Sequence, residues 1–212
     1  MEHLKSKWVK ATQKIYQGIL ISIIAGLLGG FFSAIGVAFT VLTGGAGAIV
    51  LIILTVLFTI ANIIGLVLFI QGLGEFMPLL ANQDTNSVGK IRTAAILNIV
   101  GAILAVIPVI SLAGVVLNII AFILMIMAYS ALKSSPSFPT KAREGADKLF
   151  NAMILNIIAA VCVIIPVIGW IAAFVLRIIA IVFTIKGWAM VRDSDPYIDA
   201  DRVEVVKIEV EM

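Results

Sequence analysis

Chemically reactive side chains are scarce in this sequence. Its 212 residues include one cysteine and one histidine, and charged residues make up only 13% of the chain. Cys162 has no second cysteine with which to form an intramolecular disulfide. His3 lies at the N-terminus, and none of the twelve acidic residues lies well inside a long apolar run, Glu75 being the deepest. Intramembrane proteolysis, metal-assisted hydrolysis and proton transport through a buried carboxylate all need reactive groups at such a depth. We therefore expect no enzyme, no cofactor and no metal site.

A polar segment long enough to form a separate soluble domain is also missing. No polar stretch exceeds about 20 residues, which is too short for an independent hydrophobic core. The chain is instead 62% hydrophobic, with a mean hydropathy of +1.17. Six long apolar runs lie at 15–42, 48–74, 93–109, 112–132, 149–166 and 169–190, of which the first five carry no charge and the last contains Arg177 and Lys186. Each is close to the ~20 residues that a helix needs to cross a bilayer, where backbone groups must be hydrogen-bonded within the segment. The predicted fold is therefore all-α, a polytopic transmembrane bundle of six spans.

An internal repeat arranges the six runs as three helical hairpins. AAILNIVGAILAVIPVI at 94–110 aligns without a gap with AMILNIIAAVCVIIPVI at 152–168, and KIYQGILISIIAG at 14–26 fits KIRTAAILNIVGA at 90–102 less closely. Pro108 and Pro166, both within Ile-Pro-Val-Ile, are predicted to end a helix and begin the turn at a hairpin tip. The predicted segments are an amphipathic arm (1–13), hairpins at 14–76, 90–133 and 148–192, loops at 77–89 and 134–147, and an acidic tail (193–212).

The distribution of charge predicts the topology. Nearly all lysines and arginines lie before the first run, between the second and third, between the fourth and fifth, and after the sixth, whereas the other connections carry no charge. Under the positive-inside rule the charged side is cytoplasmic, which predicts both termini in the cytoplasm and a prokaryotic inner membrane as the location. Trp8, Tyr16, Tyr129 and Trp188 are then expected to form an aromatic belt at this interface, and Trp170 to mark the opposite one.

The two ends of the chain suggest different partners. In the arm, Leu4, Trp8 and Ala11 recur at helical spacing among lysines, which predicts an interfacial helix attracted to anionic lipid headgroups. The tail from Asp193 carries seven acids and two bases, and its apolar residues alternate near the C-terminus, which is typical of a strand. A lone strand needs a partner, so the tail is either disordered or binds another protein. The scattered basic residues do not indicate nucleic-acid binding.

One arginine and four asparagines within the predicted spans are the candidate site residues: Arg177, Asn62, Asn98, Asn118 and Asn156. Arg177 has no acid within any span to pair with, so its partner is an asparagine, a backbone carbonyl or a lipid phosphate, unless it serves a function in transport. Counting residues from Lys90 and Lys133 places Asn98 and Asn118 at depths that differ by about 10 Å. On that basis Asn98 pairs with Asn156, and Asn62 with Asn118, between hairpins. The alternative is that the amides line a path for a solute.

A face of small side chains runs along the first span at strict four-residue spacing: Ser22, Gly26, Gly30, Ala34 and Ala38. Such faces allow helix backbones to approach closely in lipid. The face is expected to pack within the bundle, and the alternative is the interface of a homo-oligomer.

Together these features favour a non-enzymatic membrane protein that acts as a scaffold, an accessory subunit or a membrane-organising hairpin protein. In one form of this hypothesis, the hairpins enter from one side without fully crossing. The alternative is a small channel or solute facilitator with Arg177 and the asparagines along its path, and a further alternative is a membrane immunity or defence protein.

Overall fold

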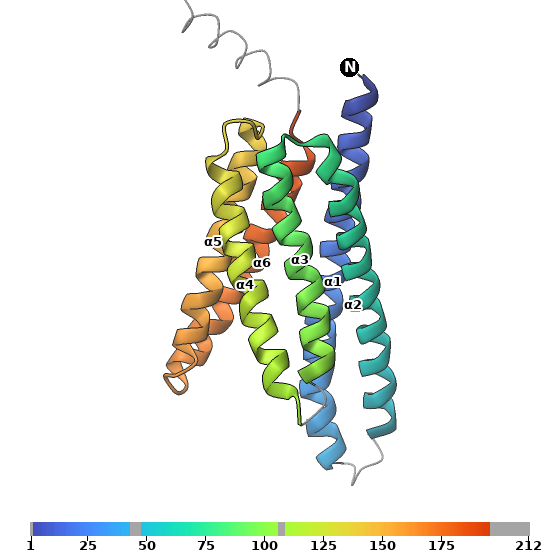
Figure 1. The fold of residues 1–212 in the computed structure, drawn as a ribbon. Helices are drawn as coiled ribbons and strands as arrows, with labels where there is room; N and C mark the ends of the chain where they lie inside the picture. Colours follow the sequence, from blue (N-terminus) through green and yellow to red (C-terminus); the bar gives the residue numbers. More distant parts are fainter. Residues whose placement is uncertain (1, 43–47, 106–108, 196–212) are drawn as a thin grey trace, which may run out of the picture.

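Over the residues that the structure describes, the protein folds into six long helices (Figure 1). The computed structural model describes residues 2–42, 48–105 and 109–195. The helices are α1 (Glu2–Leu42), α2 (Ala48–Phe76), α3 (Asn82–Ala105), α4 (Ser111–Ser134), α5 (Thr140–Cys162) and α6 (Ile168–Arg192), and a short 3-10 helix, η1 (Met77–Leu79), follows α2. All six long helices are long and apolar enough to cross a membrane. The all-helical prediction therefore holds for these ranges, which contain no strand, while the strand predicted near the C-terminus falls at positions outside them.

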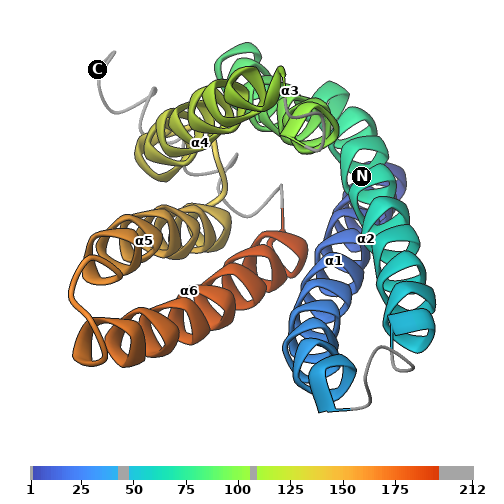
Figure 2. The same ribbon diagram turned by 90° about the horizontal axis from the view of Figure 1, so that it is seen from below.

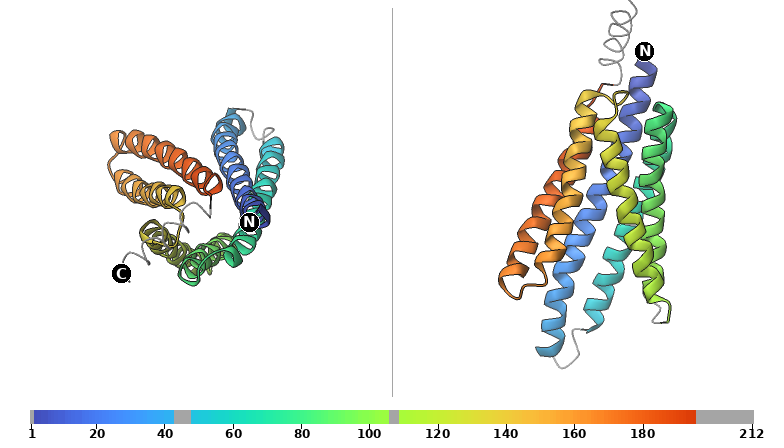
Figure 3. Two further views of the ribbon diagram at one scale, coloured as in Figure 1. Left: turned by 90° about the horizontal axis from the view of Figure 1, so that it is seen from above. Right: turned by 60° about the vertical axis from the view of Figure 1, so that its left-hand side comes forward.

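The helices pair as antiparallel hairpins in chain order, which we number hairpin 1 (α1 and α2), hairpin 2 (α3 and α4) and hairpin 3 (α5 and α6). The most extensive helix contacts are within these pairs, and the hairpins contact one another through α2 and α3, α4 and α5, and α1 and α6. The hairpins converge at the end where the described chain begins and ends, and diverge toward their tips (Figures 1 and 2). We call the end where the hairpins converge the charged end, because it carries nearly all the lysines and arginines. Figure 3 shows the same divergence from above and from the side.

Glycines bring the two helices of each hairpin together. A Cβ on Gly18 of α1 would lie 2.6 Å from the carbonyl oxygen of Gly65 on α2, and one on Gly145 of α5 would lie 2.5 Å from that of Gly187 on α6. In hairpin 2, a Cβ on Gly101 would lie 2.9 Å from the carbonyl oxygen of Gly114. Real side chains do not fit at these distances, so each hairpin depends on glycine for its close backbone packing. This is the kind of packing that holds helices together in lipid, where the hydrophobic effect gives no advantage to helix contact.

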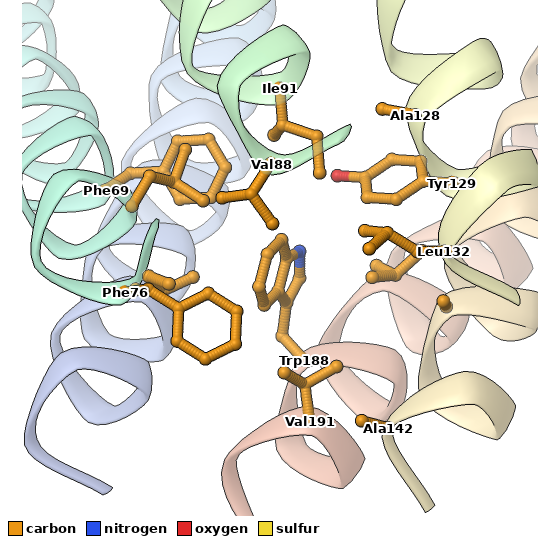
Figure 4. Packing of buried hydrophobic residues seen from close by; sticks show 14 of the residues in the cluster. Phe69, Phe76, Val88, Ile91, Ala128, Tyr129, Leu132, Ala142, Trp188 and Val191 are labelled. Atoms are coloured by element: carbon orange, nitrogen blue, oxygen red, sulfur yellow. The ribbon is translucent and has the colours of Figure 1, made fainter. Parts of the chain in front are cut away.

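The hydrophobic core lies at the charged end. Trp188 of α6 packs edge-on against Phe69 of α2, with ring centroids 5.8 Å apart, and against Tyr129 of α4, at 6.4 Å (Figure 4). Trp8 of α1 packs edge-on against Phe76 at 4.6 Å. These aromatic side chains come from all three hairpins and join them into one bundle.

Three of the four residues predicted for the aromatic belt are therefore interior residues. Trp8, Tyr129 and Trp188 are 2%, 3% and 2% exposed. These three rings do not form the expected aromatic belt at the interface, because they fill the junction between the hairpins. Tyr16 is half-buried, with the Arg192 guanidinium 4.5 Å from its ring centre, whereas Trp170 is 60% exposed near the tip of hairpin 3.

Helical structure extends beyond the predicted spans at the charged end. The arm, 1–13, belongs to α1 from Glu2 onward, and its apolar face is buried by protein: the Trp8 indole Nε1 donates to the Val191 carbonyl oxygen at 3.1 Å. Trp8 and Ala11 therefore face protein, whereas Leu4 is 50% exposed, and contact of the arm with anionic headgroups stays a prediction. The loops predicted at 77–89 and 134–147 are also shorter, because α3 begins at Asn82 and α5 at Thr140. The first two turns of α3 bury Asp84, Ser87 and Val88, those of α5 bury Ala142, Gly145 and Ala146, and this packing stabilises both segments as helix.

Candidate functional site

The asparagines predicted as site residues lie on the helix faces that form the core at the charged end. Three of them are seven residues, close to two helical turns, from a buried residue of the same helix: Asn62 from Phe69, Asn98 from Ile91 and Asn156 from Leu149. Seven residues correspond to about 10 Å of helix rise. The three hairpins therefore carry an amide at a similar distance beyond the core, in the part of the molecule where they begin to separate.

The side-chain amides of Asn62 and Asn156 form hydrogen bonds within their own hairpins. Asn62 Nδ2 donates to the Ser22 carbonyl oxygen at 3.2 Å, and Ser22 Oγ donates to the Asn62 carbonyl oxygen at 3.4 Å. Asn156 Nδ2 donates to the Ala152 carbonyl oxygen of its own helix at 3.0 Å. Among the residues that the structure describes, no hydrogen bond joins two of the four asparagines, so the pairing expected between hairpins is not formed. The Asn62 and Ser22 bonds instead join α1 to α2.

Asn118 lies closer in depth to Asn98 than its position in the sequence suggests. A Cβ on Gly101 would lie 2.6 Å from Asn118 Oδ1, so Asn118 is opposite Gly101, about 4.5 Å of helix rise from Asn98. The predicted difference of about 10 Å assumed that Lys90 and Lys133 lie at the same level. That assumption is wrong, because α3 extends from Lys90 back to Asn82 and its true end lies farther from the membrane.

A groove of about 630 Å³ opens between α1, α2 and α3 at the level of these amides. Asn62 and Asn98 contribute amides to it, Thr55 and Thr59 contribute hydroxyls, and the remaining lining is mostly apolar. The small-residue face of α1 accounts for its shape. Ser22 contacts α2, but a Cβ on Gly30 would meet no atom within 4 Å. Among the described positions of the predicted packing face, Ser22 is thus used for helix contact and Gly30 is not. The side chains of Ala34 and Ala38 are outside the described part of the structure.

Arg177 is exposed on α6, about 13 Å of helix rise from the beginning of that helix at Ile168. It lies eleven residues from Trp188, close to three helical turns, and so shares the face on which Trp188 meets the other hairpins. Within the described ranges no carboxylate lies within ion-pairing distance of Arg177. A charge at this depth needs a partner, which must be water, lipid or another molecule.

Among the described residues, buried aromatic side chains fill the junction of the hairpins at the charged end. Phe69, Tyr129 and Trp188 meet on the axis between the hairpins and close it there (Figure 4). Pro166 lies in the turn between α5 and α6 and is exposed, as expected for a hairpin tip, whereas Pro108 is outside the described residues. The polar residues at membrane depth therefore border spaces that open to the surroundings of the hairpins.

Sequence reasoning missed one buried charge. Asp84, in the first turn of α3, is 1% exposed, and its Oδ2 accepts a hydrogen bond from Ser137 Oγ at 2.7 Å. Its Oδ1 has no hydrogen-bond partner among the described residues. The signal was present, since Asp84, Val88, Ile91 and Ala95 recur at helical spacing on one face. The segment's polar composition caused it to be interpreted as a loop.

Comparisons with models of protein families, with curated proteins and with solved structures find no match to this chain. Within the described ranges, no group of three or more histidine, cysteine or carboxylate side chains is placed to hold a metal ion.

Proposed function

We propose that this multi-pass membrane protein is a non-enzymatic scaffold or membrane-organising hairpin protein, which holds three separate hairpins in the bilayer from one packed end. The observation that carries the proposal is the position of the core. Apart from Ala95, just past the middle of α3, every residue of the buried cluster lies toward the charged end of its helix or in an adjoining loop, and the hairpins diverge beyond it (Figure 1). Water drives apolar side chains together only where water is present, so the charged end is packed at the membrane boundary.

The diverging tips support the same role. Large apolar side chains there are exposed on all three hairpins, with Ile49 68%, Val109 92% and Ile164 79% exposed. Such surfaces are stable only in hydrocarbon, and lipid chains or the helices of a partner fill the spaces between the hairpins. We place the charged end in the cytoplasm on the positive-inside rule. The acidic tail then offers a contact for a soluble protein, and the open face of α1 offers one for a second copy of the chain.

One observation favours a second candidate, a solute facilitator. Arg177 is an exposed charge at membrane depth, and such residues commonly mark the pathway of an ion or solute. The aromatic cluster at the charged end argues against a continuous path, because Phe69, Tyr129 and Trp188 close the axis. We therefore rank the facilitator below the scaffold.

Reconstituted vesicles distinguish the two. Spin-labelled phospholipids report how many lipids are immobilised at the protein surface, and three separate hairpins immobilise more lipid per chain than a closed six-helix bundle. We expect this larger number together with ion and small-solute flux no higher than that of protein-free vesicles. A lipid count equal to that of a closed bundle would contradict the scaffold proposal. A flux that is lost in Arg177→Ala, with normal expression, would establish the facilitator.

Cysteine labelling tests whether the hairpins cross. In a Cys162→Ala background, single cysteines at Ile49, Val109 and Ile164 place a thiol near each tip, where the native side chains are exposed. An impermeant maleimide added on the side opposite the termini labels only tips that emerge there. Labelling of all three shows six complete spans. Hairpin 1 labelled and the others protected would show that only the longest hairpin crosses.

A further inference from the structure

Three grooves at the charged end occupy the same position on the first helix of each hairpin. The repeat alignment places Lys14 over Lys90 and Lys148. On that alignment the groove on α1 at Ser6, Val9, Lys10 and Gln13 corresponds residue by residue to the groove on α3 at Asn82, Thr85, Asn86 and Gly89. The groove on α5 follows at Thr140, Arg143, Glu144 and Asp147. Because the three grooves lie at equivalent positions, the charged residues of one groove can be compared directly with those of the other two.

The groove on α3 runs from the polar start of this helix into its apolar run. It has a volume of about 680 Å³ and extends along α3 from Asn82 to Ile96, about 21 Å of helix rise. Amide and hydroxyl side chains line one end, Lys90, Arg92 and Thr93 follow, and Ile96 and Leu124 line the other end. Arg92 is the last charged residue of α3 before its apolar run. The polar end of the groove thus matches the headgroup of a phospholipid, the cationic middle matches its phosphate, and the apolar end matches its acyl chains.

Among the described residues, the cations of the α3 groove have no acidic partner. No carboxylate lines this groove, and neither Lys90 nor Arg92 forms an ion pair with another described residue. The α5 groove contains Glu144 and Asp147, and Asp147 binds Lys133 at 3.2 Å.

The α1 groove differs in another way. Its Lys5 is paired with Asp195, and its lining ends at Gln13, before the apolar run of α1. Among the three equivalent grooves, the α3 groove thus combines uncompensated positive charge with an apolar extension into the bilayer.

We propose that the α3 groove binds an anionic phospholipid of the leaflet at the charged end. The phosphate lies between Lys90 and Arg92, where guanidinium and ammonium groups form charge-assisted hydrogen bonds with phosphate oxygens, and Thr93 supplies a hydroxyl donor. One acyl chain lies along Ile96 and Leu124. The occupant is a lipid and not a free phosphate, because a soluble anion would leave the apolar half of the groove unfilled. The inference requires the chain to be embedded in a bilayer, and it does not depend on the scaffold role.

The test uses the full-length protein in vesicles of phosphatidylcholine that contain spin-labelled phosphatidylglycerol or spin-labelled phosphatidylcholine. The measured quantity is the preference of immobilised sites for the anionic lipid. Lys90→Gln and Arg92→Gln are each expected to reduce this preference about fivefold at the groove, as for loss of one basic residue at a charged membrane surface. Both side chains are at the surface, so circular dichroism and the elution volume in detergent are expected to match the wild type.

The matched control is Lys148→Gln, at the position equivalent to Lys90 in hairpin 3. It removes the same charge from a groove that already contains two carboxylates, and it is expected to leave the preference nearly unchanged. Equal losses in Lys148→Gln and Lys90→Gln would show a general surface potential and overturn the proposal, as would a double Lys90→Gln/Arg92→Gln variant with wild-type preference.

Two further measurements separate the possible sources of phosphate. Ile96→Asn is expected to weaken retention of the anionic lipid in native mass spectrometry, with the cations intact. Inorganic phosphate added to the detergent-solubilised protein is expected to bind weakly or not at all. Phosphate binding that is lost in Lys90→Gln, combined with unchanged lipid preference, would make the groove a soluble-anion site and refute the lipid assignment. The total number of immobilised lipids tests the scaffold proposal separately, because it does not depend on headgroup charge.

Discussion

The contact between Gly18 and α2 allows a sharp test of how the hairpins are held together. A Cβ at position 18 would lie 2.5 Å from the Phe69 backbone nitrogen and 2.6 Å from the Gly65 carbonyl oxygen. Favourable contacts of carbon lie at about 3.5–4.0 Å, so α1 and α2 must separate locally by about 1 Å. The atoms in the way belong to the backbone and cannot rotate aside, and the Asn62 and Ser22 hydrogen bonds lie one turn away.

Overpacking of this kind costs about 1–3 kcal/mol, while alanine gains up to about 1 kcal/mol over glycine in a helix. We therefore expect Gly18→Ala to lower the free energy of unfolding by about 1–2 kcal/mol. Reversible unfolding by sodium dodecyl sulfate in mixed micelles measures this, with tryptophan fluorescence as the signal, because Trp188 reports on the core.

Gly30→Ala is the matched control on the same helix. A Cβ at Gly30 meets no atom within 4 Å, so this variant should unfold at the same detergent fraction as the wild type or a higher one. If Gly18→Ala and Gly30→Ala unfold together, close glycine packing does not stabilise hairpin 1, and the account of hairpin formation given above is wrong.

Three further substitutions follow from the hydrogen bonds. Asn62→Ala removes the hydrogen bond to the Ser22 carbonyl and should cost about 0.6–1.7 kcal/mol in the same unfolding assay. Asn98→Ala is the control, because the Asn98 amide has no hydrogen bond among the described residues, and this variant should be as stable as the wild type or more stable. Ser137→Ala removes the one described hydrogen bond of the buried Asp84 carboxylate and should cost about 1.5–3 kcal/mol; a neutral result would show that water reaches that carboxylate. The hydrogen bond from Arg192 lowers the pKa of Asp193 below its usual 3.8, so its contribution is present at neutral pH and is lost as the pH falls through the lowered value. Asp193 is largely exposed, which limits this contribution to less than about 1 kcal/mol, and Asp193→Asn should flatten the acid limb of a stability-against-pH curve.

The apolar runs predicted the six helices well, because lipid leaves the backbone of an apolar segment few alternatives to helix. The hairpin contacts follow from the short connections at the tips and from glycines that recur on facing helices. The repeat in sequence remains a prediction, and the equivalent grooves on α1, α3 and α5 support it.

The charged end was harder to predict, because an amphipathic helix has the same pattern whether lipid or protein covers its apolar face. Trp8 and the lysines around it fit a membrane-surface helix, yet Trp8 donates to the Val191 carbonyl in the interior. The residues that cover Trp8 come from positions more than sixty residues away, including Phe76 and Phe138. No local pattern contains that information.

The depths of the asparagines were mispredicted for a related reason. The predicted depths use lysines as markers of the membrane boundary, but α3 continues for eight residues from Lys90 to its start at Asn82. A basic side chain can extend along its helix to reach the headgroups, so its Cα position fixes the boundary only loosely. Contacts such as that of Asn118 with Gly101 locate residues more precisely than charge does.

Two driving forces act at the two ends of this molecule, and their separation explains its shape. At the charged end water is close, so burial of Trp8, Phe76 and Trp188 stabilises contact between hairpins through the hydrophobic effect. Toward the tips lipid is as apolar as the side chains, and contact is favoured only where glycines permit close packing. Glycine contacts join the helices within each hairpin, from Gly145 and Gly187 at the charged end of hairpin 3 to Gly101 and Gly114 toward the tip of hairpin 2. Each hairpin therefore stays closed along its length while the three hairpins are free to separate, which is the arrangement that a protein holding lipids or partner helices between its hairpins requires.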